Sequence, residues 1–128
     1  MNTFDIDGVI YMGPGRTGVF PGPDDVIITG RSGIDEKQET IAMLEDRGIT
    51  NKVFMNPVRF DEKTRKSSGE HKARVIRGLI SDGFDIKIHF EDDEVQADII
   101  RRAVPEIEVV VLQHNLTEKE NVRNTEWK

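Results

Sequence analysis

Residues 26–31 read Val26-Ile27-Ile28-Thr29-Gly30-Arg31. Three β-branched residues without a polar interruption are typical of a short strand that is buried on both faces, as in a parallel sheet. We expect this strand to end at Gly30, so that Thr29, Gly30 and Arg31 bring polar groups to its carboxyl end. Ligands of open parallel sheets bind at the carboxyl ends of the strands. The segment therefore predicts a fold class and the edge of the sheet where function should lie.

Similar apolar runs flank residues 26–29 and alternate with amphipathic segments. Strands are expected over residues 3–6, 52–55, 86–90 and 107–112, and helices over residues 35–47, from Ser67 or Ser68 to Gly83, and over residues 94–103. This alternation is typical of βα units joined by right-handed crossovers. The sequence thus predicts an α/β three-layer sandwich with a Rossmann-like, mostly parallel five-stranded sheet.

The expected starts of two helices rest on capping residues. Asp35 can cap the first helix, and Ser67 and Glu70 have the spacing of a capping box. Lys72 would then lie near the start of the second helix, where a cation opposes the helix dipole. An anion bound there would offset that cost. The alternative is a solvent-facing lysine whose charge is screened.

Composition limits the class of protein. The chain has 128 residues, a net charge of −6 and no cysteine. We expect one domain over residues 1–114 and a polar C-terminal tail over residues 115–128. The lack of cysteine excludes disulfides and thiolate metal sites and favours a cytoplasmic protein. The negative charge argues against non-specific nucleic-acid binding but not against a nucleotide substrate. No apolar run is long enough to span a membrane, so no membrane partner is expected.

Acidic side chains follow two of the expected strands. They are Asp5 and Asp7 after the first, and Asp92 and Asp93 after the fourth. If those strands are neighbours, the four carboxylates converge and repel one another, which a hard divalent cation would relieve. An oxygen-only ligand set favours Mg²⁺ over Zn²⁺. The alternative is a turn with solvated carboxylates.

Polar and basic groups near the same edge could bind a phosphoryl group. Thr29 offers a hydroxyl group, and the backbone N–H groups after it face the same end of the sheet. The alternative for Thr29 is a β-branched strand end. Further basic candidates for substrate contact are Arg31, Arg59, Lys63, Arg65 and Lys66. Those from residues 59–66 could equally form an ordinary solvated loop. His89 is expected to pack or cap rather than catalyse.

With these residues at its strand ends, the chain resembles the haloacid-dehalogenase-like superfamily over about residues 3–113. The resemblance is carried by four motifs: Asp5-x-Asp7-Gly8-Val9, Val26-Ile27-Ile28-Thr29-Gly30-Arg31, Lys72, and Phe90-Glu91-Asp92-Asp93. Within that superfamily the chain is most similar to the phosphatase domain of polynucleotide kinase 3′-phosphatases.

The resemblance implies a Mg²⁺-dependent phosphomonoesterase. Asp5 would be the nucleophile that forms an aspartyl-phosphate, and Asp7 would act as general acid and then as general base. Thr29, Gly30, Arg31 and Lys72 would hold the phosphoryl group. Mg²⁺ would be bound by Asp5, by the backbone carbonyl of Asp7 and by Asp92, with Asp93 as a further ligand or a group that orients metal-bound water.

Two departures from the family pattern bear on the substrate. Only a Gly/Pro-rich segment separates the first two expected strands, so the first crossover should lack its helix. The segment between Asn56 and Lys72 is too short for a cap domain. An open site suits a bulky substrate such as a nucleic-acid end. A homodimer could cover the face of the sheet that lacks the crossover helix. The alternative function is a non-catalytic module or subunit that binds metal or phosphate, and an enzyme completed by a partner is a third reading.

Overall fold

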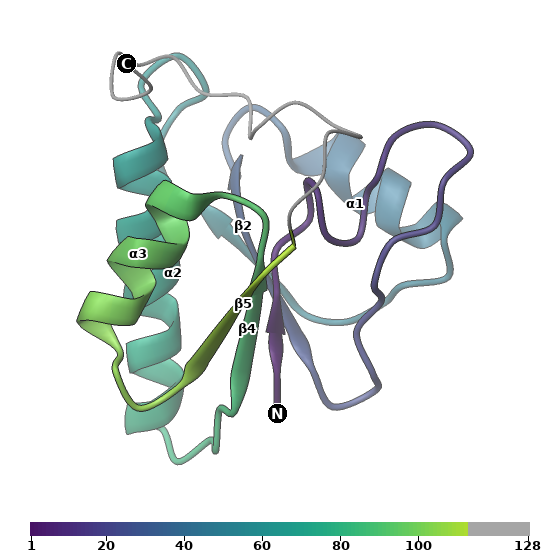
Figure 1. Ribbon diagram of the computed structural model, residues 1–128. Coiled ribbons are helices and arrows are strands. Elements are labelled where there is room, and N and C mark those ends of the chain that lie inside the picture. Colours follow the sequence, from purple (N-terminus) through teal and green to yellow (C-terminus); the bar gives the residue numbers. More distant parts are fainter. Residues whose placement is uncertain (113–128) are drawn as a thin grey trace.

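The computed structural model describes residues 1–112, which form one parallel sheet flanked by helices (Figure 1). The strands are β1 (Thr3–Phe4), β2 (Val26–Ser32), β3 (Val53–Asn56), β4 (Ile88–Glu91) and β5 (Glu108–Val111). Their order in the sheet is β3-β2-β1-β4-β5, and every neighbouring pair is parallel. The predicted five-stranded α/β fold is confirmed, with β1 in the centre.

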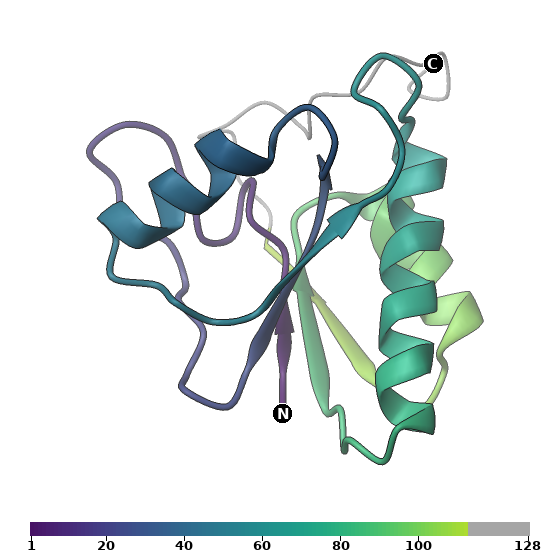
Figure 2. The same ribbon diagram turned by 180° about the vertical axis from the view of Figure 1, so that it is seen from behind.

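The helices form the two outer layers. Helices α2 (Arg65–Ser81) and α3 (Glu94–Ala103) pack together on one face of the sheet, and α1 (Lys37–Asp46) covers part of the other (Figures 1 and 2). Ile27 and Ile28 show the division, because adjacent residues of a strand point to opposite faces. Ile28 belongs to the core under α2 and α3, whereas Ile27 belongs to the core under α1. The predicted three-layer arrangement is therefore present.

The first crossover has no helix, as the sequence predicted. After β1 the chain folds into a turn in which the Ile6 carbonyl accepts the N–H groups of Val9, Ile10 and Tyr11. Ile6, Val9 and Ile10 are fully buried and take part in the core under α1. Between β3 and α2 lie only residues 57–64, too few for a cap domain. Within the described residues, β1 is therefore followed by a turn instead of a crossover helix, and β3 by a short loop instead of a cap domain.

Two predicted helix starts are wrong. Helix α2 begins at Arg65, and its capping box joins Thr64 and Ser67 instead of Ser67 and Glu70. Lys72 therefore lies well inside the helix, and its charge does not face the helix start. At α1 the N-cap is Glu36, while Asp35 accepts the N–H of Phe60 at 2.8 Å. Several polar side chains near each helix start can act as the N-cap, and spacing along the chain alone does not tell which one does.

Two expectations concern the rest of the chain. Among the described residues no helix has the length and apolar character needed to cross a membrane. The predicted boundary between residues 1–114 and the tail at 115–128 lies outside the described residues.

His71 makes the stability of the fold sensitive to acid. It lies on α2 and is only 5% exposed. Burial lowers the pKa of His71 to about 4, and the backbone carbonyls of Phe54 and Thr29 oppose this shift only partly. The unfolded chain takes up the proton near pH 6.5, before the folded chain does, so protonation favours unfolding. We expect the free energy of unfolding to fall by about 3 kcal/mol between pH 7.5 and pH 4 from this group.

Urea unfolding at several pH values measures this effect. The neutral variant His71→Gln should show a smaller loss in acid than the wild type. It should not abolish the loss, because burial also lowers the pKa of His89. Equal acid sensitivity in the two proteins would contradict the assignment to His71.

Candidate functional site

Three buried carboxylates meet where β1 and β4 end. Asp5 follows β1 and is tied to β4 by a hydrogen bond from its N–H to the Phe90 carbonyl (3.0 Å). Glu91 is the last residue of β4, and Asp92 follows it. One carboxylate oxygen from each of Asp5, Glu91 and Asp92 lies within 4.8 Å of the others. We call these three residues the acidic cluster; its geometry could hold a metal ion.

Lys72 reaches the acidic cluster from α2. Its ammonium group lies 3.0 Å from an Asp5 oxygen and 2.9 Å from a Glu91 oxygen, and the side chain is fully buried. Three carboxylates against one ammonium leave a formal charge of −2 in a site closed to bulk water. Buried charge of this size is costly unless it is neutralised. One divalent cation would neutralise it.

Glu91 is the most tightly held member of the cluster. Burial alone would raise the pKa of Glu91, but the charge of Lys72 and a hydrogen bond with His89 outweigh it and lower that pKa. Glu91 is therefore ionised at neutral pH. We did not predict Glu91 or His89 as site residues. The available signal was that they alternate with Ile88 and Phe90, which puts both polar side chains on the face of β4 that α2 covers.

Gly8 brings the backbone of the first loop against Asp92. It has a φ of +82°, and a Cβ atom at this position would lie 2.1 Å from an Asp92 carboxylate oxygen. Only glycine allows both this backbone conformation and this close approach. The Asp7–Gly8 peptide is therefore beside the acidic cluster, where the resemblance places a backbone ligand.

A Gly8→Ala substitution is expected to displace Asp92 and to weaken the binding of a divalent cation by the acidic cluster. Titration with Mg²⁺, followed by calorimetry or by the melting temperature, measures the effect. Gly15→Ala is the matched control, because Gly15 lies in the same loop with a φ of +72° and has nothing within 4 Å of the added Cβ. Both variants carry the backbone strain, but only the first touches the cluster. Equal Mg²⁺ affinity in the two would contradict the role of this contact.

Asp7 lies outside the acidic cluster and binds Arg31. The Arg31 guanidinium donates to both Asp7 carboxylate oxygens, at 2.9 and 2.7 Å, and to the Thr40 hydroxyl at 3.2 Å. Arg31 lies in the part of β2, between Ile28 and Ser32, where the register against β3 shifts. The structure thus pairs two predicted site residues with each other.

Asp93, predicted to join the metal site, is not part of the cluster either. It is the N-cap of α3 and accepts the N–H of Val95 at 3.0 Å. It also accepts hydrogen bonds from Arg65 (2.9 Å from Nε) and Gln96 (3.0 Å). Burial opposes ionisation, but these donors, led by Arg65, lower the pKa of Asp93. Glu91 occupies the place in the cluster that the prediction gave to Asp93.

The other predicted binding residues lie at the same edge in structural roles. The Thr29 hydroxyl accepts the N–H of Arg31 at 3.0 Å. The Gly30 carbonyl accepts the ammonium group of Lys63 at 3.3 Å, and Lys63 also pairs with Glu36 at 2.9 Å. Among the basic candidates, Arg31, Lys63 and Arg65 form ion pairs. The side chains of Arg59 and Lys66 are exposed.

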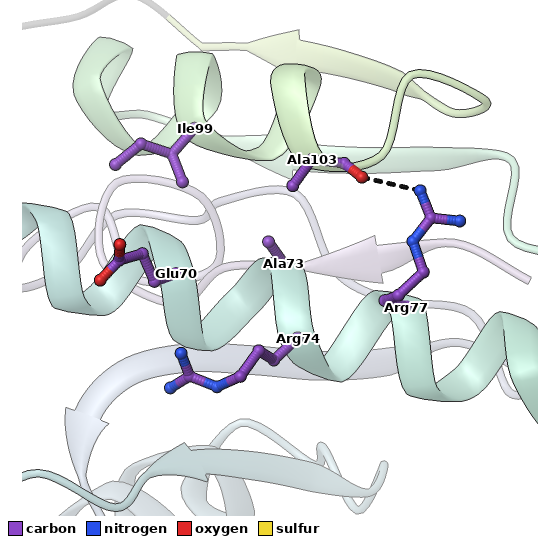
Figure 3. Close-up of a pocket in the computed structure, with 6 residues that line it drawn as sticks. All are labelled: Glu70, Ala73, Arg74, Arg77, Ile99 and Ala103. Atoms are coloured by element: carbon purple, nitrogen blue, oxygen red, sulfur yellow. Dashed lines mark hydrogen bonds between the residues drawn. The ribbon is translucent and has the colours of Figure 1, made fainter.

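A separate groove lies between α2 and α3, with a volume of about 450 Å³ (Figure 3). Its floor includes Ala73, Ile99 and Ala103, and Arg77 closes one end by donating to the Ala103 carbonyl at 2.7 Å. None of its lining residues belongs to the predicted site. It is an ordinary seam between two packed helices.

The fold and site define an α/β protein whose parallel sheet carries a buried acidic cluster and a buried lysine at the carboxyl ends of its strands. No protein-family model matches the chain, and no curated protein matches it in sequence.

Proposed function

We propose that this protein is a Mg²⁺-dependent phosphohydrolase of the haloacid-dehalogenase-like type, with Asp5 as the nucleophile. The observation that supports this most is the contact between the Lys72 ammonium and the Asp5 carboxylate (3.0 Å) inside the buried acidic cluster. It joins a candidate nucleophile to a cation that can bind a phosphoryl oxygen. Three of the four motifs in the resemblance lie at the carboxyl ends of β1, β2 and β4, and the fourth, Lys72, reaches the same edge from α2.

The donor set suits Mg²⁺. Asp5 and Asp92 would hold it, together with the backbone carbonyl of Asp7, and all three groups offer the hard oxygen ligands that Mg²⁺ prefers. When bound, Mg²⁺ neutralises the negative charge of the phosphoryl oxygens. The formal charge of −2 and the close contact of Gly8 with Asp92 are the features of this structure that support the fit.

The chain's own residues can carry out the transfer in two steps. An Asp5 oxygen attacks phosphorus, an aspartyl-phosphate forms, and the bond from phosphorus to the leaving oxygen breaks. Asp7 gives its proton to that oxygen and then takes a proton from the water that attacks the aspartyl-phosphate. The second step releases inorganic phosphate and restores Asp5. Lys72 stabilises the phosphoryl oxygens through both steps.

Arg31 must exchange partners for Asp7 to act as an acid. In the structure the Arg31 guanidinium donates to both oxygens of Asp7, so both oxygens are occupied by hydrogen bonds to Arg31. A phosphate monoester is itself a strong partner for a guanidinium group. In the proposed cycle the substrate draws Arg31 away, and Asp7 then turns toward the leaving oxygen.

The substrate class we propose is a bulky phosphate monoester, such as a nucleotide or a nucleic-acid end. The site has no cap domain between β3 and α2 and no crossover helix after β1. Arg59, on the loop after β3, and Lys66, in the first turn of α2, are exposed. Both could contact the rest of such a substrate.

The test is phosphate release by the wild-type protein from a panel of aryl phosphates, nucleotides and 3′-phosphorylated oligonucleotides. Release that needs Mg²⁺ and stops with a chelator is the expected result. Mg²⁺ binding without release from any substrate would refute the proposal and favour the non-catalytic binding module. Release that appears only with an added partner protein would favour an enzyme that works within a complex.

A further inference from the structure

A line of buried polar side chains runs behind the acidic cluster, and the proposed chemistry does not use it. Thr3 on β1 and His89 on β4 are register partners, and both are fully buried. The Thr3 hydroxyl lies 2.7 Å from Nδ1 of His89, and Nε2 of His89 lies 3.0 Å from Oε1 of Glu91. The same Glu91 oxygen accepts the Lys72 ammonium at 2.9 Å. The line thus leads from the centre of the sheet to the group that touches Asp5.

The direction of these hydrogen bonds follows from the chemistry of the groups. Burial lowers the pKa of His89 in spite of the neighbouring Glu91, so the imidazole is neutral and carries one N–H. Glu91 already accepts the Lys72 ammonium and two backbone N–H groups, so its carboxylate acts as an acceptor toward His89 as well. Nε2 of His89 must therefore carry the proton and donate to Glu91, and Nδ1 must accept from the Thr3 hydroxyl. This fixes a single tautomer and a single orientation of the ring.

The oxygens of Glu91 are fully used by protein donors. Oε1 accepts His89 and Lys72, and Oε2 accepts the backbone N–H groups of Asp92 and Asp93, each at 3.3 Å. Binding a cation would require Glu91 to give up some of these bonds inside the protein, where replacing them is costly. The Asp92 carboxylate lies against Gly8, in the loop whose Asp7 carbonyl is the third ligand proposed for the cation.

We propose that Glu91, oriented by His89 and Thr3, is a positioning residue that holds the Lys72 ammonium against Asp5, and that Glu91 is not a ligand of the cation. The inference rests on the proposed function, since it assigns Lys72 to the phosphoryl group. It adds three residues to the site and divides the acidic cluster into two metal-binding carboxylates and one that binds lysine.

Two substitutions of His89 separate this role from a merely structural one. In His89→Gln the side-chain amide can occupy the place of Nε2 and still donate to Glu91. In His89→Asn the shorter amide reaches only the place of Nδ1, so the bond to Glu91 is lost. Both variants put an amide in the same buried position, which makes them matched controls. We measure the affinity for Mg²⁺ alone and for inorganic phosphate in the presence of Mg²⁺, both by calorimetry.

We expect His89→Asn to weaken phosphate binding about tenfold or more, as a small misplacement of a binding group does. His89→Gln should retain most of the wild-type affinity. In both variants the affinity for Mg²⁺ should change by less than about tenfold, because about tenfold is the smallest loss expected when a metal ligand is loosened. In the wild type, ¹⁵N NMR should show a protonated Nε2 and an unprotonated Nδ1 in His89.

Three results would each overturn the inference. One is the opposite tautomer of His89, and another is equal phosphate affinity in the two variants. The third is a loss of Mg²⁺ affinity beyond tenfold in His89→Asn. A wild type that releases no phosphate, with the difference between the variants intact, would refute the proposed function alone. Robust hydrolysis with phosphate binding unchanged by His89→Asn would refute only the positioning role. A wild type that binds no phosphate would refute both.

Discussion

Asp5→Asn is expected to reduce Mg²⁺-dependent phosphate release by more than about a thousandfold, because the amide cannot form the aspartyl-phosphate. The substitution is nearly isosteric, and Lys72 keeps its second partner, Glu91. The variant should therefore fold, and its lost activity should reflect lost chemistry. Initial rates on the best substrate of the wild type, with circular dichroism to confirm folding, measure the effect.

Asp25→Asn is the matched control. Asp25 precedes β2 at the opposite end of the sheet and accepts the N–H groups of Asn2 and Gly22, each at 2.8 Å. The same substitution there should leave the rate unchanged within a factor of about two, since Asp25 touches none of the reacting groups. Wild-type rates in Asp5→Asn would show that another group attacks phosphorus or that hydrolysis occurs elsewhere.

Asp7→Asn should behave differently from Asp5→Asn. A general acid matters most when the leaving oxygen is strongly basic. Asp7→Asn should therefore impair alkyl phosphates much more than aryl phosphates with acidic leaving groups, whereas Asp5→Asn should impair both. An equal loss on both substrate types would contradict the acid role of Asp7.

The layers of the fold, and the edge of the sheet that carries the acidic cluster, could be predicted because they follow from local patterns. A β-branched run such as Val26-Ile27-Ile28 has few structures available to it, and glycines such as Gly48 end helices through a positive φ. The missing crossover helix was readable from the glycine and proline content after Gly13. Asp5 and Asp92 were placed together correctly because strand ends at one edge must meet.

The partners of individual side chains could not be predicted in the same way. Whether Asp92 or Asp93 joins the cluster depends on Arg65, which lies on another element and pairs with Asp93. Asp7 pairs with Arg31, which lies on β2, where the register against β3 shifts. These outcomes are set by packing between distant segments, and spacing along the chain carries no information about them.

Lys72 was expected to face an anionic group, and the structure gives a different reason for that contact than the sequence argument did. The sequence argument placed it at a helix start and inferred an anion from the opposed dipole. In the structure it is inside α2 and is neutralised by Asp5 and Glu91. The conclusion that Lys72 faces an anionic group survives, but the anions are carboxylates of the protein itself.

This arrangement predicts that Lys72→Met lowers the free energy of unfolding by about 3–5 kcal/mol, the usual cost of removing one partner from a buried ion pair. Methionine keeps most of the volume of the side chain, so little of the loss comes from packing. It leaves Asp5, Glu91 and Asp92 with a formal charge of −3 in a buried site. Urea or guanidinium unfolding in a chelator measures the change.

Lys87→Met is the matched control for the same change of side chain. Lys87 also forms an ion pair at 3.0 Å, with Asp85, but both side chains are more than two-thirds exposed. Exposed pairs contribute little, so this variant should lose no more than about 1 kcal/mol. If Lys72→Met were as stable as Lys87→Met, the Lys72 ammonium would not be holding the cluster together.

Mg²⁺ should reverse part of the loss in Lys72→Met. A ligand that binds only the folded state stabilises it more as its affinity rises, and a site with a formal charge of −3 attracts a divalent cation more strongly than one of −2. The melting temperature of Lys72→Met should therefore rise more on adding Mg²⁺ than that of the wild type. Adding Glu91→Gln to Lys72→Met should recover stability in the chelator and shrink this extra rise, because the uncompensated charge returns to −2. A double variant that responds to Mg²⁺ as strongly as Lys72→Met would show that the cation does not act through the charge of this cluster.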